Sequence, residues 1–419
     1  MIKMQRKKVV VIGAGAAGMM AAGAAAALGA SVTLIEKNPR VGRKLMITGK
    51  GRCNILNNCD VPAFIQNVPV NARFLYSAVN RFSPSDAYAF FESIGIPLKT
   101  ERGNRSYPQS DKAVDVVDAL RRYVLESGAQ IVTDTAEELL LENGEVMGVK
   151  CQKHTHYADS VIVCCGGKSY PLTGSTGDGY TLARQAGHTI VSVKPSLVPL
   201  ESPDNDCKSM QGLSLRNVGL KIIDTQSGKT AYEDFGEMLF THFGLSGPMI
   251  LSASSHLRDI KPGQYMASVD LKPALDAEQL DKRLQKDFLE NSNRDVSNAF
   301  AKLLPRKIIV PVLKRWGVPF DKKCHSVTRE ERRRLVDILK AFTVPISGYR
   351  PIEEAIVTSG GVKVSEINPK TMESKLIAGL YFAGEVIDVD AYTGGFNLQI
   401  AWSTGRLAGE SAAIYTNLH

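Results

Sequence analysis

The hydrophobic pattern of the first forty residues predicts a strand, a helix and a second strand. Lys7–Gly13 contains an unbroken apolar run of strand length, which is typical of a strand buried in a parallel sheet. An alanine-rich stretch of helical length follows and ends at Gly29, and Ser31–Lys37 is a second apolar strand. This order indicates one βαβ unit at the start of an α/β fold.

The pattern then changes twice along the chain. Ala113–Gly128 has helical periodicity, and short strands over 130–151 are predicted to form a β-meander that returns to the parallel sheet at Val161–Cys165. From about residue 194 the apolar residues alternate as in antiparallel strands, and from about residue 276 they follow a helical period. After about residue 342 the α/β pattern of the N-terminal part returns. We therefore expect a discontinuous dinucleotide domain with one insertion. The expected ranges are 1–193 with 343–419 for the dinucleotide domain and 194–342 for the inserted domain, antiparallel over about 194–275 and helical and basic over about 276–342.

The turn between the first strand and helix carries the pattern Gly13-x-Gly15-x-x-Gly18. Gly13 permits a tight turn, Gly15 lets the backbone approach a pyrophosphate, and Gly18 lets helix and strand pack closely. The helix N-terminus offers free N–H groups to the phosphates, and Glu36 follows the second strand, where it can accept hydrogen bonds from a ribose. With strand, helix and acid all in place, the pattern predicts dinucleotide binding.

A second cofactor signal lies near the C-terminus. Gly379–Asp388 reads as a strand that runs into Gly384-Glu385, where two-segment FAD-binding domains place a Gly-Asp pair against the ribityl and phosphate groups. Glu385 replaces the usual aspartate. A helix then begins near Gly395, and its first amides can point at the flavin and stabilise negative charge there.

Four long motifs resemble one known family: "GRKLMITGKGRCN", "CCGGKSYPLTGSTGDGYTLARQAGH", "GEMLFTHFGLSGP" and "TMESKLIAGLYFAGEVIDVDAYTGGFNLQIAWSTG". They are similar to the BaiN/YhiN-like family of bacterial FAD-dependent oxidoreductases. The resemblance implies a two-segment Rossmann-like FAD domain of the glutathione-reductase and fumarate-reductase type, with an inserted β-barrel and helices. It also implies reduction of activated C=C bonds, in substrates from steroid enones to a ribosomal RNA uridine, or amine oxidation. Cys164-Cys165, expected in a strand, and Tyr107 depart from the family pattern.

The motif "TGKGRCN", Thr48–Asn54, is predicted to form the flavin-facing edge of this site. Lys50 and Arg52 are expected to lower the pKa of Cys53, which could then donate a proton to the substrate. Packing of Cys53 beneath the flavin and a redox role are the alternatives. The predicted cofactor-binding residues are Gly13, Ala14, Gly15, Ala16, Ala17, Gly18, Glu36, Lys37, Arg43, Lys44, Thr48, Gly51, Arg52, Asn54, Gly166, Gly384, Glu385, Asp388, Gly395, Phe396, Asn397 and Leu398.

Two further residues complete the catalytic hypothesis beside Cys53. His242, in "FTHFGLSGP", is either a structural hydrogen-bonding residue or a group that faces the substrate. Arg105, like Asn397, is a candidate for orienting a substrate carbonyl. His154 and His156 form an HxH pair that is expected to be exposed and to lack a third ligand nearby, so no metal site is predicted.

Charge and composition extend the picture to the substrate. Twelve cations and four acids lie between Ala301 and Lys340, so the chain's whole net charge of +8 falls within this window. The window is either a solvated helical face or a surface for a polyanion. Seven cysteines without framework spacing favour a reducing compartment. The basic, apolar N-terminus imitates a signal peptide, but its glycine spacing favours the dinucleotide turn, so a cytoplasmic protein without membrane contact is expected.

The primary hypothesis is an FAD-dependent oxidoreductase that reduces an activated C=C bond with hydride from NAD(P)H through flavin N5. Because the chain has a single GxGxxG, NAD(P)H is expected to bind only transiently. The basic window makes a uridine of 23S ribosomal RNA the leading substrate, converted to dihydrouridine after the base is extruded. The alternatives are a small-molecule flavin oxidase or enone reductase for an amine or steroid-like substrate, and a non-catalytic flavin-bearing RNA-binding protein.

Overall fold

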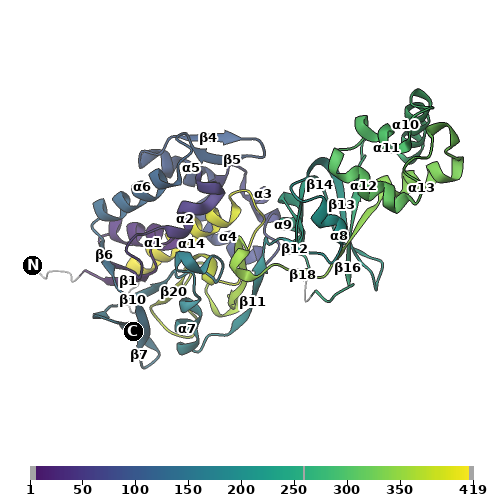
Figure 1. The fold of residues 1–419 in the computed structure, drawn as a ribbon. Coiled ribbons are helices and arrows are strands. Elements are labelled where there is room, and N and C mark those ends of the chain that lie inside the picture. Colours follow the sequence, from purple (N-terminus) through teal and green to yellow (C-terminus); the bar gives the residue numbers. More distant parts are fainter. Residues whose placement is uncertain (1–5, 258–259, 415–419) are drawn as a thin grey trace, which may run out of the picture. The chain divides into compact units, whose positions relative to one another are not determined.

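The computed structural model divides the chain into two compact units, between Ser196 and Leu197 and again between Pro351 and Ile352. It describes residues 6–257 and 260–414. The first unit is built from both ends of the chain, and the second is one continuous insertion (Figure 1). The boundary expected after residue 342 would cut a strand of the second unit, so the insertion extends further along the chain than the sequence suggested.

A five-stranded sheet forms the centre of the first unit, and every neighbouring pair in it is parallel. The buried apolar runs of two inner strands, Lys8–Ile12 and Ser160–Val163, match a sheet covered on both faces. The segment after Gly128 belongs to this sheet and not to the meander in which the sequence placed it. The strand order is β20 (Leu380–Phe382), β10 (Ser160–Val163), β1 (Lys8–Ile12), β2 (Ser31–Glu36) and β6 (Gln130–Thr133).

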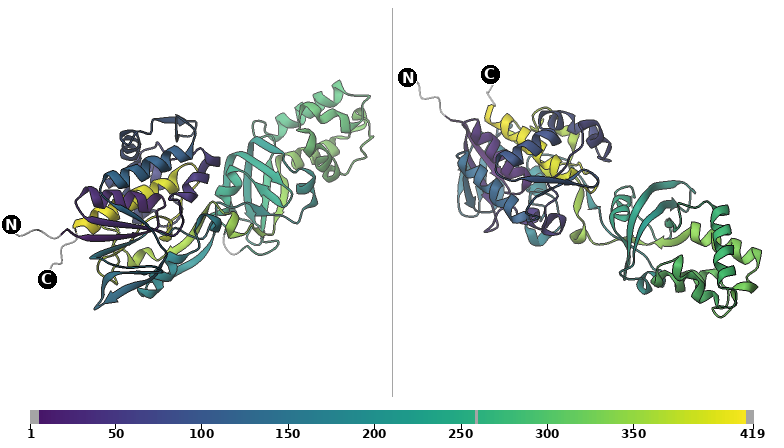
Figure 2. Two further views of the ribbon diagram at one scale, coloured as in Figure 1. Left: turned by 60° about the vertical axis from the view of Figure 1, so that its left-hand side comes forward. Right: turned by 90° about the horizontal axis from the view of Figure 1, so that it is seen from above.

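Helices α1 (Ala16–Ala27) and α14 (Phe396–Ile414) lie side by side against this sheet (Figures 1 and 2). Alanine, the strongest helix former, makes up most of α1. A Cβ at Gly405 would lie 2.5 Å from Ala17 O, and one at Gly409 would lie 2.3 Å from Ala21 O, so only glycine permits this packing. The other helices of the unit are α2 (Arg43–Ile47), α3 (Val61–Gln66), α4 (Tyr76–Arg81), α5 (Pro84–Ser93), α6 (Ala113–Glu126) and α7 (Asp178–Gln185).

Three smaller sheets surround the parallel sheet of the first unit. One holds β3, β5 and β4, the second is the meander β7-β8-β9, and the third pairs β11 with β19, the strands that adjoin the insertion. Their bounds are β3 (Leu56–Asn57), β4 (Leu98–Glu101), β5 (Arg105–Pro108), β7 (Ala136–Glu142), β8 (Glu145–Cys151), β9 (Thr155–Tyr157), β11 (Ile190–Ser196) and β19 (Val357–Val362).

The second unit contains a seven-stranded antiparallel sheet, and the helices of residues 277–340 gather beyond one end of it (Figures 1 and 2). The strand order is β17 (Phe342–Ile346), β16 (Tyr265–Asp270), β13 (Ser214–Asp224), β14 (Thr230–Thr241), β15 (Gly244–Ser246), β12 (Leu200–Glu201) and β18 (Gly348–Tyr349). The helices are α8 (Asn205–Ser209), α9 (Pro248–Ser254), α10 (Ala277–Glu290), α11 (Val296–Ala299), α12 (Arg306–Trp316) and α13 (Arg329–Lys340).

The second unit has an aromatic core of its own, in which the fully buried Trp316 packs within 6.1 Å of the rings of Phe288 and Phe300. Within the described part of the chain, no helix combines the length and apolarity needed to cross a membrane.

Candidate functional site

The turn between β1 and α1 leaves space beside one glycine and none beside the other two. A Cβ on Gly13, whose φ is +97°, would lie 2.7 Å from Cys164 O, and a Cβ on Gly18 would lie 1.8 Å from Gly13 O. A Cβ on Gly15 would meet no atom within 4 Å. Gly15 also precedes the first turn of a twelve-residue helix, where N–H groups lack intrahelical partners. The turn therefore offers room and a positive dipole end to an anionic group.

Glu36 ends β2 beside this turn with its carboxylate almost fully covered. Its Oε2 accepts a hydrogen bond from Ala14 N at 2.9 Å, and its Oε1 accepts from the backbone and side-chain nitrogens of Asn38 at 2.9 and 2.7 Å. Arg43 in turn donates to Asn38 Oδ1 at 2.7 Å. These bonds hold the acid at the edge of the glycine turn, the position predicted for ribose binding.

Two lysines that were predicted to bind the cofactor make ion pairs within the first unit. Lys37 Nζ lies 2.6 Å from an Asp178 carboxylate oxygen, and Lys44 Nζ lies 2.6 Å from Glu385 Oε2. Lys44 Nζ also donates to Ser169 Oγ at 2.6 Å. The charge of each lysine is thus already opposed by a carboxylate, which reduces what it can contribute to a phosphate.

Gly384, next to Glu385, brings the C-terminal signal against the first turn of α1. Glu385 Oε1 accepts a hydrogen bond from Thr358 N at 2.8 Å. The preceding Gly384 has a φ of +77°, and a Cβ there would lie 2.8 Å from Ala17 Cβ in the first turn of α1. Gly384 N donates to Thr404 Oγ1 at 3.0 Å. The end of β20 and the start of α1 therefore meet, so the structure brings the two predicted cofactor segments together.

Two asparagine side chains from outside the loop before α14 hold its backbone. Asn71 Nδ2 donates to Asp388 O at 2.6 Å, and burial raises the pKa of the Asp388 carboxyl. Both ends of the Asn397 amide bond to the backbone of Ala391, at 2.9 and 2.7 Å, so Asn397 holds this loop and has little capacity left to orient a substrate carbonyl. A Cβ on Gly395 would lie 2.3 Å from the backbone of β3. This close approach places the N-terminus of α14 beside the segment that follows Cys53.

The structure contradicts the expectation that neighbouring cations lower the pKa of Cys53. Cys53 is completely buried, and burial raises its pKa well above the usual range of a thiol. The Arg52 guanidinium is paired with the carboxylates of Glu101 and Asp111 and lies 4.1 Å from the centre of the Tyr107 ring. Arg52 is thus neutralised by residues distant in the sequence, and the geometry favours the packing role of Cys53.

The backbone of this loop is left-handed at most of its positions. Gly49, Lys50, Gly51 and Cys53 have φ values of +61°, +60°, +84° and +62°. The conformation costs a residue with a side chain about 1–2 kcal/mol. Two such residues persist here, and strained backbone of this kind concentrates at functional sites. The predicted cofactor residues Thr48, Gly51, Arg52 and Asn54 all belong to this loop or adjoin it.

The other catalytic candidates are exposed. Arg105 lies in β5 and its Nε donates to Arg102 O at 3.1 Å. His242 belongs to the second unit, in the turn between β14 and β15, where its ring centre lies 5.0 Å from that of Phe243. Their proposed catalytic roles stay predictions. Cys164 and Cys165 follow the last residue of β10 and are not strand residues as expected.

The expectation that His154 and His156 lack a third ligand nearby is wrong. The side chain of His154 is 68% exposed, as predicted, but His156 is half-buried. The fold brings donor atoms of Asp134 and Cys151 within 4.8 Å of a ring nitrogen of His156. The sequence showed only the HxH spacing. Asp134 and Cys151 could not be connected with it because they lie on two other segments of the chain.

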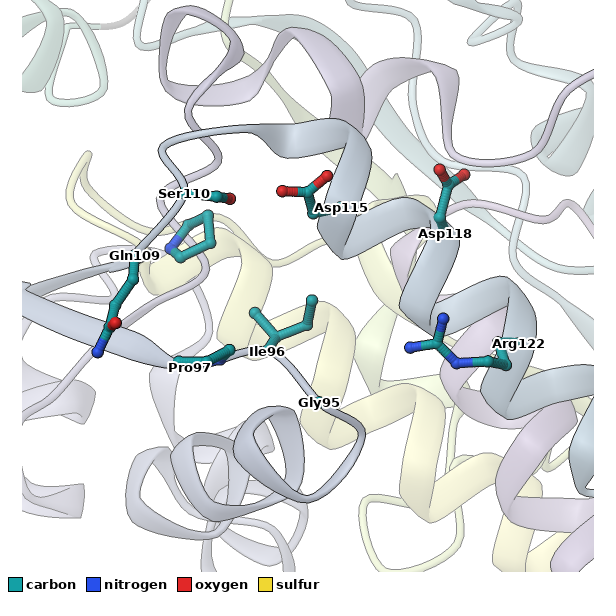
Figure 3. A pocket seen from close by; sticks show the side chains of 9 residues that line it. Gly95, Ile96, Pro97, Gln109, Ser110, Asp115, Asp118 and Arg122 are labelled. Atoms are coloured by element: carbon teal, nitrogen blue, oxygen red, sulfur yellow. The ribbon is translucent and has the colours of Figure 1, made fainter.

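A surface pocket of about 370 Å³ opens beside the start of α6 (Figure 3). The side chains of Asp115, Asp118 and Arg122 give it a rim of mixed charge, and none of the predicted site residues lines it. We therefore take the glycine turn as the candidate site. The lining residues are Gly95, Ile96, Pro97, Pro108, Gln109, Ser110, Asp115, Asp118 and Arg122.

Known proteins resemble the chain over nearly its whole length. Residues 7–411 match the family described as the HI0933-like protein Rossmann domain. The chain is 31% identical to the 3-dehydro-bile acid delta(4,6)-reductase of Clostridium scindens, over 96% of this chain and 98% of that protein. It is 30% identical to the ribosomal RNA dihydrouridine synthase of Haemophilus influenzae, over 94% and 96%. The fold is similar to that of the 3-ketosteroid-delta4-(5alpha)-dehydrogenase of Rhodococcus jostii RHA1, with a TM-score of 0.51, 14% identity, and coverage of 99% and 98%.

Proposed function

This chain belongs to the HI0933-like family of flavoprotein oxidoreductases, and on that premise we propose that it uses FAD to reduce an activated C=C bond. Two relatives that are at least 30% identical carry names that denote such a reduction, one in a bile acid and one in a ribosomal RNA uridine. The observation that carries the proposal is the geometry of the glycine turn. It leaves open space at Gly15 and places Glu36 and the end of β20 beside it.

The residues of the first unit suit each part of FAD. The space beside Gly15 and the N-terminus of α1 suit the pyrophosphate, and the carboxylate of Glu36 suits the ribose hydroxyls. The N-terminus of α14 suits the ring, because its dipole favours negative charge. When bound, FAD supplies the two-electron centre that carries hydride. NAD(P)H is the reductant that we propose.

We propose a uridine of ribosomal RNA as the substrate, because part of the basic window is available to a polyanion. Five of its twelve cations form ion pairs within the second unit, such as Arg315 with Asp204 and Arg332 with Asp281. Contacts with several phosphates would offset the energy needed to extrude the base. Among the described residues, seven cations of the window are exposed and form no ion pair: Lys302, Arg306, Lys307, Lys314, Arg329, Arg333 and Arg334.

The salt dependence of RNA binding tests this surface. Replacing Arg329, Arg333 and Arg334 of α13 with glutamine removes three available charges, so we expect the slope of log affinity against log salt to fall by about 2. Lys221→Gln is the control, since its exposed ammonium is paired with Glu233 in the same unit. An unchanged slope in the triple variant, or no binding of ribosomal RNA fragments at low salt, contradicts the role of α13.

Dihydrouridine mapping tests the reaction itself. We expect ribosomal RNA from cells lacking this gene to lose one dihydrouridine, and complementation with the intact chain to restore it. An unchanged map removes uridine as the substrate. The non-catalytic alternative fails if the RNA reoxidises the reduced flavin under anaerobic conditions.

A second candidate is reduction of a small steroid-like enone, which the 31% identity to the bile acid reductase favours. Anaerobic reoxidation of the reduced flavin separates the two candidates when a steroid enone and an RNA fragment are compared at equal concentration. Rapid reoxidation by the enone alone would favour the second candidate and leave the positive charge on α13 as a solvated face.

A further inference from the structure

Three segments of the first unit converge beside the meander. All three come more than a hundred residues after the glycine turn in the sequence. Asp134 follows β6, Cys151 ends β8 and His156 is the middle residue of β9. A carboxylate oxygen, the thiol sulfur and a ring nitrogen of these residues all lie within 4.8 Å of one another. His156 pairs with Val149 across the two strands, and Cys151 lies two residues beyond Val149, so Cys151 and His156 share one face of the meander.

One nitrogen of His156 has no structural use in the fold. Its Nε2 is covered from solvent, and no hydrogen-bond partner lies within reach among the described residues. Buried polar atoms are paired in the great majority of cases, so such an atom calls for a ligand. Cys151 beside it is buried and free of any disulfide. The imidazole of His156 and the thiol of Cys151, two groups that suit a transition metal, therefore lie close together in this part of the fold.

Asp134 also has a structural role in the fold. Its carboxylate is 3% exposed and accepts hydrogen bonds from Thr135 N at 2.8 Å and from the backbone nitrogens of Lys153 and His154 at 3.2 Å. These bonds cap the tight turn that joins β8 to β9. They explain why Asp134 is buried, but they do not explain the unpaired nitrogen of His156 or the thiol beside it.

We propose that Asp134, Cys151 and His156 bind one divalent transition-metal ion, with Zn²⁺ as the best match. Thiolate, imidazole and carboxylate are the ligands of protein zinc sites, at bond lengths of about 2.0–2.3 Å. Such bonds in a tetrahedron imply ligand separations of about 3.3–3.7 Å, so the three side chains need to approach one another by about 1 Å. On binding, the Cys151 thiol releases its proton to solvent.

His154 lies at the exposed side of Asp134 and is a candidate for a fourth ligand. His154 Nδ1 lies 3.5 Å from Asp134 Oδ2, and the side chain of His154 is largely in solvent. In the proposed site, His154 or water would complete the tetrahedron. The metal joins the edge strand of the parallel sheet to the meander, and Asp134 N donates to Glu36 O at 3.0 Å, so the joined edge adjoins the acid predicted to bind ribose.

Cobalt spectroscopy on the full-length protein, as purified with its flavin and then freed of metal by a chelator, tests the proposal. We expect Co²⁺ to bind with one equivalent per chain, to give a thiolate-to-cobalt charge-transfer band, and to be displaced by Zn²⁺. Cys151→Ser is expected to abolish the band. His156→Gln is expected to weaken Zn²⁺ binding at least about tenfold, since even outer-shell partners are worth that much.

Two control variants isolate the group. Cys59→Ser removes a half-buried thiol elsewhere in the first unit, and Tyr157→Phe alters the exposed neighbour of His156; both are expected to keep the band. The proposal is overturned if the unaltered protein shows no thiolate–cobalt band, or if Cys151→Ser binds Zn²⁺ as tightly as the unaltered protein. If a variant does not fold, the presence or absence of the cobalt band in the unaltered protein still decides the question. No substrate is needed for this measurement, so its result is independent of the proposed function.

Discussion

Replacing Gly15 with alanine separates cofactor binding from folding at the glycine turn. The added methyl group meets no protein atom within 4 Å, whereas the same change at Gly18, three residues on, places a Cβ 1.8 Å from Gly13 O. Gly15→Ala is therefore expected to change the unfolding free energy of the flavin-free protein by less than about 1 kcal/mol. Gly18→Ala is expected to lower it by about 2–3 kcal/mol, because the start of α1 must move away from the Gly13 carbonyl.

Gly15→Ala, which is expected to leave the stability almost unchanged, should nevertheless weaken the binding of FAD. If the pyrophosphate passes over Gly15, the methyl group overpacks that contact at a cost of about 1–3 kcal/mol, which raises the Kd for FAD about 5- to 150-fold. Urea unfolding followed by circular dichroism measures the first quantity, and quenching of flavin fluorescence on binding measures the second. Unchanged FAD affinity in folded Gly15→Ala would refute the placement of the pyrophosphate at this turn.

Three further predictions concern individual side chains. Cys53→Ser buries a hydroxyl in place of the thiol and should lower the unfolding free energy by about 1–3 kcal/mol in urea; a loss of about 10²-fold or more in substrate reduction per bound flavin would instead restore the proton-donor role. Burial lowers the pKa of His188 from 6.5, so the unfolded chain binds more protons below that pH, and the unfolding free energy should fall as the pH drops. His188→Gln should flatten that part of the stability curve, and an equal slope in the variant would contradict the assignment. Lys44→Met leaves Glu385 without its cation and should cost about 1–3 kcal/mol in urea, whereas Lys150→Met, from an exposed ion pair, should cost less than about 1 kcal/mol.

The sequence was sufficient where the determining contacts are local. The strand, turn and helix that carry Gly13 and Gly18 are consecutive in the sequence. The spacing of the glycines was therefore enough to predict where the backbone of the helix packs closely against the turn. Four-residue strands carry too little pattern to show their partners. Gln130–Thr133 was therefore assigned to the meander, although it pairs in parallel with β2.

The failures at the candidate site share a different cause, which is that partners arrive from distant segments. The carboxylates that neutralise Arg52 belong to Glu101 and Asp111, 49 and 59 positions along the chain. These two acids lie outside the motif "TGKGRCN", so the prediction from the sequence overestimated the positive potential at Cys53. The same limit hid the donors beside His156, because Asp134 and Cys151 reach it only through the pairing of the meander.

The contact between α1 and α14 bears on how the chain folds as it is made. A ribosome delivers Ala17 and Ala21 early, but their partners Gly405 and Gly409 emerge only with the last helix, and β10 likewise waits for β20. The second unit, in contrast, holds all seven strands of its sheet in one continuous stretch. We expect it to fold during synthesis, while the glycine turn acquires its final packing, and with it the capacity to take up flavin, only after α14 has left the ribosome.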